Sequence, residues 1–393
     1  MSSILYIHFK TLFKIIYLNC IKHFGWRRLL ATLIFLIVAV AVCVILFVFR
    51  LLDEVFFYRY RKTKIEHPVF IVSNPRSGTT FTHRLLCMDE ERYVHMLMYH
   101  TIIPSVTFYK IVHIISKLDR RTGRPFRRFF DWVDSWFFKG WEGIHPTGFN
   151  QSEEDEGLYI FSFLSVAVCL ICPYMQEFGY LTIIDKMPER SRRNLRKYYR
   201  SSIQRFMYAE GQGKTLLNKN VITTGRLHTI LDVFPDARIV YLIRDPESAV
   251  PSFISMFSAL WKWTSPELAE NGPEYRALGQ IAIDLYNYFH KNKNKFNSDN
   301  FYVVPYKNLT ANPVRVIEDV YAHFEMDMSE TFRSRLKIHL DSPKKYKSLH
   351  TYSLEQYGFT KEEIEQKLEG IMVEYGFMTV DSGRQTVDVT LHV

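Results

Sequence analysis

The sequence predicts an α/β fold, with a central parallel sheet flanked by helices and preceded by one N-terminal transmembrane helix. Short apolar runs such as Val69–Val72 are followed by turn residues and then by helical segments, which is typical of parallel strands with helical crossovers. A loop rich in Ser, Thr and Gly follows this run directly. Near the N-terminus, the segment Leu29–Phe49 contains only one polar side chain, Thr32.

The N-terminal apolar segment is long enough to cross a hydrocarbon core of about 30 Å. It lies too far from the terminus for a signal peptide, and no small-residue cleavage site follows it. We therefore expect a single-pass membrane protein. The expected parts are a basic segment at residues 1–28, the transmembrane helix at 29–49, a basic juxtamembrane stem at 50–66, one large domain at 67–378 and a polar tail at 379–393.

Charge is concentrated around this segment, because residues 1–66 carry ten Lys or Arg against three acidic residues, in a chain of formal net charge +9. Such a distribution favours contact with anionic lipid headgroups. It argues against nucleic acid as a partner, which requires a basic face on the folded domain. Five basic residues flank the segment on each side, so the sequence leaves the membrane orientation open.

The five cysteines do not predict a disulfide framework. Two of them, Cys169 and Cys172, have the spacing of a redox motif, but they fall in the apolar run Leu158–Cys172. We expect this run to be a core helix and the two thiols to be buried and structural.

The stretch Val69–Leu86 predicts a P-loop-like unit of strand, tight loop and helix. The backbone N–H groups of Arg76–Thr80 are expected to point at one spot, reinforced by the positive end of the helix. An anionic ligand is therefore expected there. Gly78 would let the backbone approach it closely, and the residues expected to bind it are Arg76, Ser77, Gly78, Thr79 and Thr80.

The loop lacks the G-x-x-x-x-G-K-[ST] spacing of nucleotide triphosphatases, so no metal ion is expected. The segment Gly211–Thr215 ends in Gly-Lys-Thr but has Tyr208 at the position of the first glycine. We interpret this segment as the turn that leads into the next strand.

The segment Pro75–Thr80 resembles the 5′-phosphosulfate loop of sulfotransferases that use 3′-phosphoadenosine 5′-phosphosulfate (PAPS). A second match lies at Phe234–Ser252, where a strand leads into Arg-Asp-Pro and a Ser follows eight residues after the Arg. In that family the Arg and the Ser bind the 3′-phosphate, which implies this role for Arg244 and Ser252. A position at the carboxyl end of a parallel strand suits Arg244 to ligand binding.

The resemblance extends over about residues 67–376 and implies further roles. The pair Asn218-Lys219 at a strand end resembles that of protein-tyrosine sulfotransferases, which implies that Lys219 touches the transferring sulfuryl group. Arg76, Lys219 and the loop N–H groups are then expected to be catalytic, by neutralising the leaving phosphate and the equatorial oxygens. Tyr306, after the strand Phe301–Tyr306, is implied to lie against the adenine. Lys347 falls where relatives place a basic loop that closes over the cofactor.

Several residues are candidates for the base that takes the proton of the acceptor hydroxyl. His100 follows a predicted strand at Val94–Met98, and the alternative for it is a strand-end histidine without a catalytic role. His145 and the acids Glu153–Glu156, among them Glu154, lie where bacterial-type sulfotransferases resemble this chain. The alternative for the acids is to begin a helix capped by Ser152.

Residues 120–145 alternate basic and aromatic side chains, which predicts either an interface with a bilayer or an aromatic cap over the site. Together these features predict transfer of a sulfuryl group from PAPS to a hydroxyl of a lipid, glycan or other small acceptor near a membrane. A kinase-like phosphotransferase and a non-catalytic membrane scaffold are the alternatives. The identity of the acceptor and the oligomeric state stay open.

Two glycosylation sequons, at Asn150 and Asn308, bear on the membrane side. A glycan at Asn308 would crowd Tyr306. This favours a catalytic domain in the compartment where PAPS is made, as for a bacterial enzyme, whereas a Golgi-type enzyme would have a lumenal domain.

Overall fold

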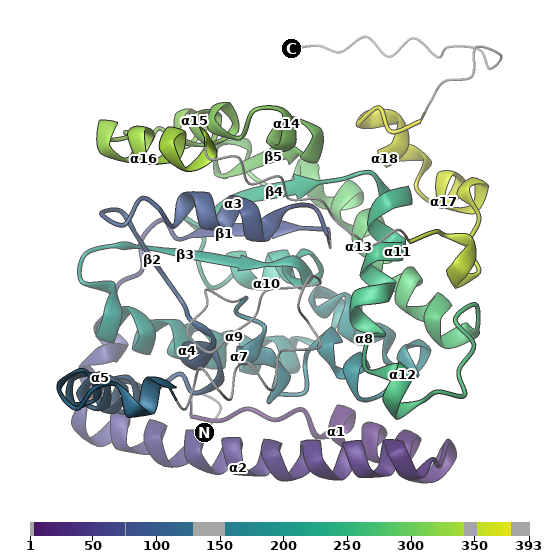
Figure 1. Ribbon diagram of the computed structural model, residues 1–393, viewed down its shortest axis with the longest axis horizontal. Coiled ribbons are helices and arrows are strands. Elements are labelled where there is room, and N and C mark those ends of the chain that lie inside the picture. The colour runs from purple at the N-terminus through teal and green to yellow at the C-terminus, as the bar shows by residue number, and fades with distance from the viewer. Residues whose placement is uncertain (1–3, 75, 129–153, 342–351, 379–393) are drawn as a thin grey trace.

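The structure is a computed structural model that describes residues 4–74, 76–128, 154–341 and 352–378 (Figure 1). Its centre is a sheet of five parallel strands in the order β2-β3-β1-β4-β5. The strands are β1 (Val69–Ser73), β2 (Tyr93–His95), β3 (Thr215–Asn220), β4 (Arg238–Ile243) and β5 (Phe301–Pro305). The predicted parallel sheet is thus confirmed.

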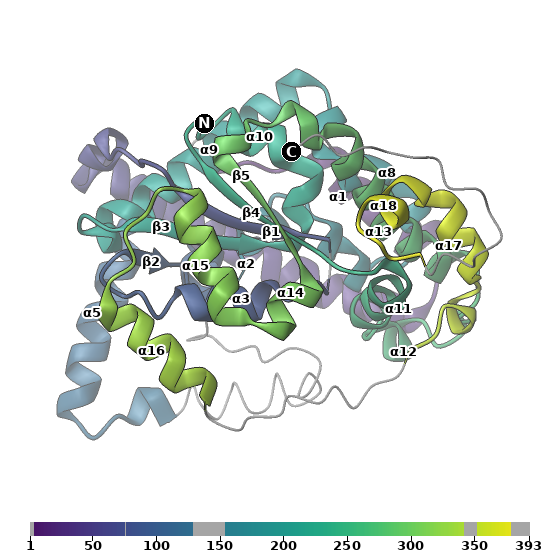
Figure 2. The ribbon, with the colours of Figure 1, turned by 90° about the horizontal axis from the view of Figure 1, so that it is seen from above.

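Helices cover both faces of the sheet, as Figure 2 shows from above. Alternation along β1 explains this, because successive side chains of a strand point to opposite faces. Val69 and Ile71 belong to one apolar cluster, with residues of α3 (Thr79–Leu86), α15 (Pro313–His323) and α16 (Glu330–Asp341). Phe70 and Val72 belong to the other cluster, with residues of α9 (Glu189–Phe206), α10 (Leu227–Leu231) and α13 (Pro273–Asn292).

The remaining α-helices are α1 (Phe9–Tyr17), α2 (Trp26–Phe56), α4 (Met98–Ile102), α5 (Val106–Arg121), α7 (Gly157–Ile160), α8 (Gly179–Thr182), α11 (Pro246–Phe257), α12 (Trp261–Thr264), α14 (Tyr306–Ala311), α17 (Lys361–Lys367) and α18 (Glu369–Glu374). Short 3₁₀ or π segments among the described residues include η1 (Leu18–Lys22), η2 (Tyr58–Lys62), η4 (Val166–Leu170), η7 (Met207–Gly211) and η8 (Val221–Arg226).

Two sequence predictions about secondary structure were wrong. The second strand ends at His95, and Met98, which was expected to close it, begins α4 instead.

The apolar run Leu158–Cys172 is not one helix. Its α-helical part ends at Ile160, Phe163 adopts a left-handed backbone with φ of 59°, and Ser165 then caps the 3₁₀ segment η4 by accepting from the N–H of Ala167. An apolar run indicates that its residues are buried, but it does not indicate whether they form one continuous helix. The thiols of Cys169 and Cys172 are buried and free, as expected.

The N-terminal apolar segment forms α2, a 31-residue helix that by length and composition is able to cross a membrane. In Figure 1 it runs along the lower side of the domain, beside α1. Near its C-terminal end, Asp53 is fully buried and accepts hydrogen bonds from Arg205 Nε (2.9 Å) and Ser105 Oγ (3.0 Å). The helix therefore packs against the rest of the chain.

Candidate active site

The loop between β1 and α3 has the backbone shape of an anion-binding loop. Arg76 and Gly78 both adopt positive φ angles, 67° and 90°, and α3 begins immediately afterwards at Thr79. Alternation of left-handed and right-handed residues turns successive N–H groups towards one side. The N–H of Thr82 then donates to the carbonyl of Gly78 (3.0 Å), so the first turn of α3 is closed.

Gly78 is required at its position for two reasons. Its φ of 90° is unfavourable for residues with a side chain. A Cβ there would also lie 2.9 Å from Leu309 Cδ2 and 3.1 Å from Tyr306 Cε2. The ring of Tyr306 therefore lies close to the loop at Gly78.

The predicted 3′-phosphate residues meet the loop from the adjacent strand. Arg244 follows β4, and its Nη1 donates to the carbonyl of Arg76 (3.0 Å). Arg76 Nε donates to Ser252 Oγ on α11 (3.0 Å), so the hydroxyl points back at the loop. The Arg244 guanidinium lies 4.7 Å from the centre of the Tyr306 ring. Four predicted cofactor residues from separate parts of the sequence are thus brought together.

Lys219 reaches the same loop from the other neighbouring strand. It is fully buried on β3, opposite Ile71 of β1, and its Nζ donates to Thr80 Oγ1 (3.1 Å). Within the described ranges, no carboxylate forms an ion pair with Lys219 or Arg244. Cations flank the loop on both sides, and this arrangement suits an anionic ligand. Those ranges also contain no cluster of His, Cys, Asp and Glu side chains able to hold a metal ion.

The acidic run after residue 152 contributes to the packing behind Lys219. Asp155 is buried and accepts from the Tyr199 hydroxyl (2.5 Å), from Asn218 Nδ2 (2.7 Å) and from Asn220 Nδ2. Burial raises the pKa of the Asp155 carboxyl. The sequence reasoning missed this network, although two asparagines in a buried strand were a signal, because such strands are normally apolar.

Glu156 has a similar structural role, since its Oε2 accepts from Arg226 and from Asn220 Nδ2 (2.7 Å). Glu154 differs because it is only half-buried. The N–H of the next residue, Asp155, donates to the carbonyl of Lys219 (3.4 Å), which places Glu154 beside the strand end that carries Lys219.

His100 lies inside an aromatic cluster formed with Tyr99, Tyr109 and Phe206. Its Nδ1 accepts from the N–H of Leu97 (2.9 Å), and burial lowers the pKa of its imidazole to about 3. An imidazole with so low a pKa, enclosed by aromatic side chains, is poorly suited to take a proton from a substrate. His145 and Lys347 lie outside the described residues, as does Pro75.

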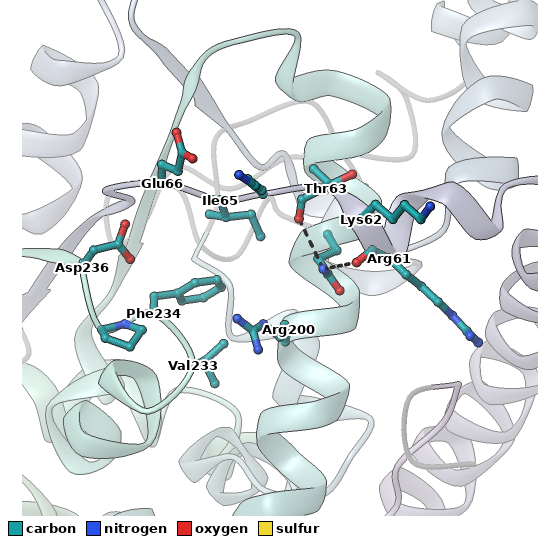
Figure 3. A pocket seen from close by; sticks show the side chains of 12 residues that line it. Arg61, Lys62, Thr63, Ile65, Glu66, Arg200, Val233, Phe234 and Asp236 are labelled. Atoms are coloured by element: carbon teal, nitrogen blue, oxygen red, sulfur yellow. Dashed lines mark hydrogen bonds between the residues drawn. The ribbon is translucent and has the colours of Figure 1, made fainter.

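A separate pocket of about 580 Å³ lies at the opposite end of the sheet (Figure 3). Residues 61–66, Arg200 of α9 and the segment Val233–Asp236 line it. The N–H of Arg238, the first residue of β4, donates to the carbonyl of Pro68 just before β1 (2.9 Å), so the pocket adjoins the strand beginnings. Ligands of open parallel sheets bind at the strand carboxyl ends. The pocket is therefore distinct from the loop site.

Comparison with known proteins identifies the family and the fold. The model of the sulfotransferase family matches residues 68–330, a range that contains the loop, Lys219, Arg244, Ser252 and Tyr306. The chain belongs to the sulfotransferase family. Two curated sulfotransferases are similar to it, the omega-hydroxy-beta-dihydromenaquinone-9 sulfotransferases Stf3 of Mycobacterium bovis and Mycobacterium tuberculosis. Each is 24% identical over 311 residues, covering 76% of this chain and 73% of the relative.

Solved sulfotransferase structures share the fold. STF1 of Mycobacterium tuberculosis H37Rv aligns with a TM-score of 0.64 at 20% identity, covering 94% of this chain and 100% of that one. STF9 of Mycobacterium avium aligns with a TM-score of 0.62 at 17% identity, covering 81% of this chain and 79% of that one.

Proposed function

We propose that this sulfotransferase transfers the sulfuryl group of PAPS to a hydroxyl of a lipid, glycan or other small acceptor at a membrane. The convergence of two sets of anion-binding side chains on one loop carries this proposal. Arg244 and Ser252 approach the loop from one side, and Lys219 approaches Thr80 from the other. Two separated cationic positions suit a nucleotide with phosphate at two positions.

The nucleotide half of the site has a distinct role for each group. Arg244 and Ser252 hold the 3′-phosphate, and the face of Tyr306 supports the adenine. Arg76 spans the two halves, because its guanidinium contacts Ser252 while its backbone belongs to the loop. Lys347, from a segment outside the described residues, is assigned by the family resemblance alone to a basic loop that closes over the cofactor.

PAPS supplies an activated sulfuryl group when bound. The N–H groups of the loop and the hydroxyls of Ser77 and Thr79 hold the 5′ end in place. The ammonium of Lys219 and the hydroxyl of Thr80 donate to the oxygens on which negative charge develops during transfer. Donors fixed in advance in a water-poor site stabilise such charge strongly, and Lys219 is both fixed and buried.

The acceptor hydroxyl loses a proton during transfer, and Glu154 is the candidate base that the described residues favour. It lies beside Lys219 and is half-buried, whereas Asp155 and Glu156 are buried. His145 is the second candidate, from the sequence resemblance.

A lipid acceptor is supported by two observations. The curated relatives are named for action on an omega-hydroxy-beta-dihydromenaquinone-9. This chain also has an N-terminal helix of membrane-spanning length and composition, which would keep the enzyme at the surface where a lipid is dissolved.

Calorimetry tests the donor assignment. We expect 3′,5′-ADP to bind at least about tenfold more tightly than 5′-AMP, since a charged hydrogen bond contributes about 1.5–3 kcal/mol and 1.4 kcal/mol is a factor of ten. ATP should bind weakly with or without Mg²⁺. Tight, Mg²⁺-dependent binding of ATP, with no preference for the 3′-phosphate, would instead support the kinase-like alternative.

A further inference from the structure

The N-terminal helices carry most of the exposed apolar surface of the protein. Of the 31 large apolar side chains that are exposed among the described residues, 20 lie within residues 9–58. On α2 the exposed set is Trp26, Leu30, Leu33, Ile34, Ile37, Val38, Val40, Val44, Ile45, Phe47, Val48, Leu51, Val55 and Phe56. Together these side chains expose an apolar area on the order of 1,000 Å², whereas soluble monomers rarely expose more than a few hundred Å² of apolar surface in one patch.

The opposite stripe of α2 packs against the domain along its whole length. Its buried positions are spaced by three, four or seven residues, which places them on one face of a helix: Arg28, Thr32, Ala39, Leu46, Arg50 and Asp53. Thr32 accepts from Asn19 Nδ2 (3.0 Å), and the ring of Phe35 contacts that of Phe163 edge-on, with centroids 6.0 Å apart. The segment predicted to lie in lipid on all sides therefore has one face in protein.

Both ends of α2 are held by the same folded body. Before the helix, Lys14 Nζ donates to the carbonyl of Glu177 (2.6 Å), and Asn19 Nδ2 donates to the carbonyl of Ile171 (2.9 Å). At its far end, Arg50 Nη1 donates to Ser202 Oγ (2.9 Å), and Arg205 Nε donates to Asp53 (2.9 Å).

A helix of 31 residues is about 46 Å long at 1.5 Å per residue, more than the bilayer core of about 30 Å. A spanning helix would put its two ends on opposite sides of a membrane. The domain contacts both ends and the middle, so α2 lies along the domain surface.

Two neighbouring helices extend the apolar face. Figure 1 shows α1 and α5 in the same lower layer as α2, and in Figure 2 all three lie farthest from the viewer. On α1, Phe9, Phe13 and Tyr17 are exposed at four-residue intervals. On α5 the exposed apolar residues are Ile111, Ile114, Ile115 and Leu118.

Basic side chains on the same helices and their connections bear on what this face binds. Exposed basic side chains accompany the apolar ones in these helices and their connections: Lys10, Arg59, Lys62, Lys110, Lys117, Arg120 and Arg121. Lys22 and Arg61 are exposed as well, but they pair with Glu177 and Glu54. The acids of the same region are engaged, because Asp53 and Glu54 pair with Arg205 and Asp119 is buried. An apolar stripe with basic flanks is the pattern of a helix that lies in the headgroup region of an anionic bilayer.

We infer that α1, α2 and α5 form a monotopic membrane-binding face, and that α2 lies in the plane of an anionic bilayer and does not cross it. Exposed basic residues before and after α2, such as Lys10 and Arg59, then contact the same leaflet, so the similar charge on the two sides of the helix needs no orientation across a membrane. The chain in this arrangement has its N-terminal segment and its catalytic domain on one side of the membrane.

Protease protection on vesicles tests this disposition. The full-length protein, with one tag before Met1 and another after Val393, is diluted from detergent into preformed liposomes of phosphatidylcholine and phosphatidylglycerol. We expect the protein to float with the liposomes and both tags to be cleaved by added protease. Protection of either tag would overturn the inference in favour of a spanning helix. Failure to float, with a dimer in solution, would overturn it in favour of a second copy covering the face.

Variants separate the apolar face from general surface effects. Ile37→Glu and Val44→Glu change side chains on the exposed stripe, which are 70% and 56% exposed. Each should reduce liposome binding at least tenfold, while the midpoint of thermal unfolding in detergent stays the same.

Val373→Glu on α18 is the matched control, since Val373 is 62% exposed and α18 lies on the opposite side of the molecule (Figure 1). It should bind liposomes normally. Equal loss of binding in the three variants, or no loss in any, would contradict the inference. The readout is independent of sulfuryl transfer.

Discussion

Replacement of Arg244 by Ala should weaken the binding of ligands with a 3′-phosphate selectively. In the free protein Arg244 has two local contacts, a hydrogen bond to the carbonyl of Arg76 and the ring of Tyr306 at 4.7 Å. The substitution therefore removes a phosphate donor and also loosens the loop that holds the 5′ end. A single binding measurement would mix the two effects.

A pair of ligands separates them. Loss of the hydrogen bond to Arg76 is expected to cost about 1 kcal/mol and to affect every nucleotide that uses the loop. Loss of the charged contact to the 3′-phosphate should cost a further 2–3 kcal/mol, or about 30- to 150-fold in affinity. Only PAPS and 3′,5′-ADP should show this second loss. Adenosine 5′-phosphosulfate and 5′-AMP, which lack the group, should lose about fivefold.

The assay is isothermal titration of the four ligands into wild type and Arg244→Ala at fixed ionic strength. Arg193→Ala, an exposed arginine on α9, is the matched control and should leave all four affinities unchanged. Equal losses for the two classes of ligand would refute the assignment of Arg244 to the 3′-phosphate.

Three further substitutions have defined outcomes. Lys219→Ala should lower kcat by about 100-fold or more with little change in the affinity for 3′,5′-ADP, because the amine is assigned to the transferring group; a collapse of that affinity with normal turnover would show that the role is wrong. Gly78→Ala should weaken PAPS binding at least tenfold in titrations, since its Cβ would press on Leu309 and Tyr306 at a φ of 90°, and unchanged affinity would exclude a tight loop. Asp53→Ala should lower the free energy of unfolding by about 3–5 kcal/mol, because a buried ion pair is broken. Chemical denaturation in detergent measures this change, and Glu66→Ala, at an exposed position, is the control that should leave stability unchanged. Equal stability of the two variants would contradict the packing of α2 against the domain.

The sequence was sufficient to predict the parallel sheet and the composition of the loop site. Strand β1 and its turn are local features, and Arg244 and Ser252 are eight residues apart on a continuous strand and helix. Local spacing therefore determined their relative position. Tyr306 was assigned by the family resemblance, and its position directly after a strand of the parallel sheet brings it to the same edge.

The missed features depend on contacts between distant segments. Asp155 is hydrogen-bonded to Asn218, which lies 63 residues later in the sequence. The acidic residues next to Asp155 therefore gave no indication that its carboxylate is buried. The packing of α2 was missed because hydropathy has the same value whether an apolar side chain meets lipid or protein. Thr32 was the sole polar signal within the segment, and its partner Asn19 lies 13 residues earlier.

Transfer of label from ³⁵S-PAPS tests the central claim most directly. Wild type and Lys219→Ala are incubated with the labelled donor and with separate lipid and glycan extracts, and sulfated products are counted after extraction. We expect wild type to move label into an acceptor together with stoichiometric release of 3′,5′-ADP, and Lys219→Ala to do so about 100-fold more slowly. Binding of 3′,5′-ADP by a protein that labels no acceptor from either extract, or equal rates for the two proteins, would contradict the account.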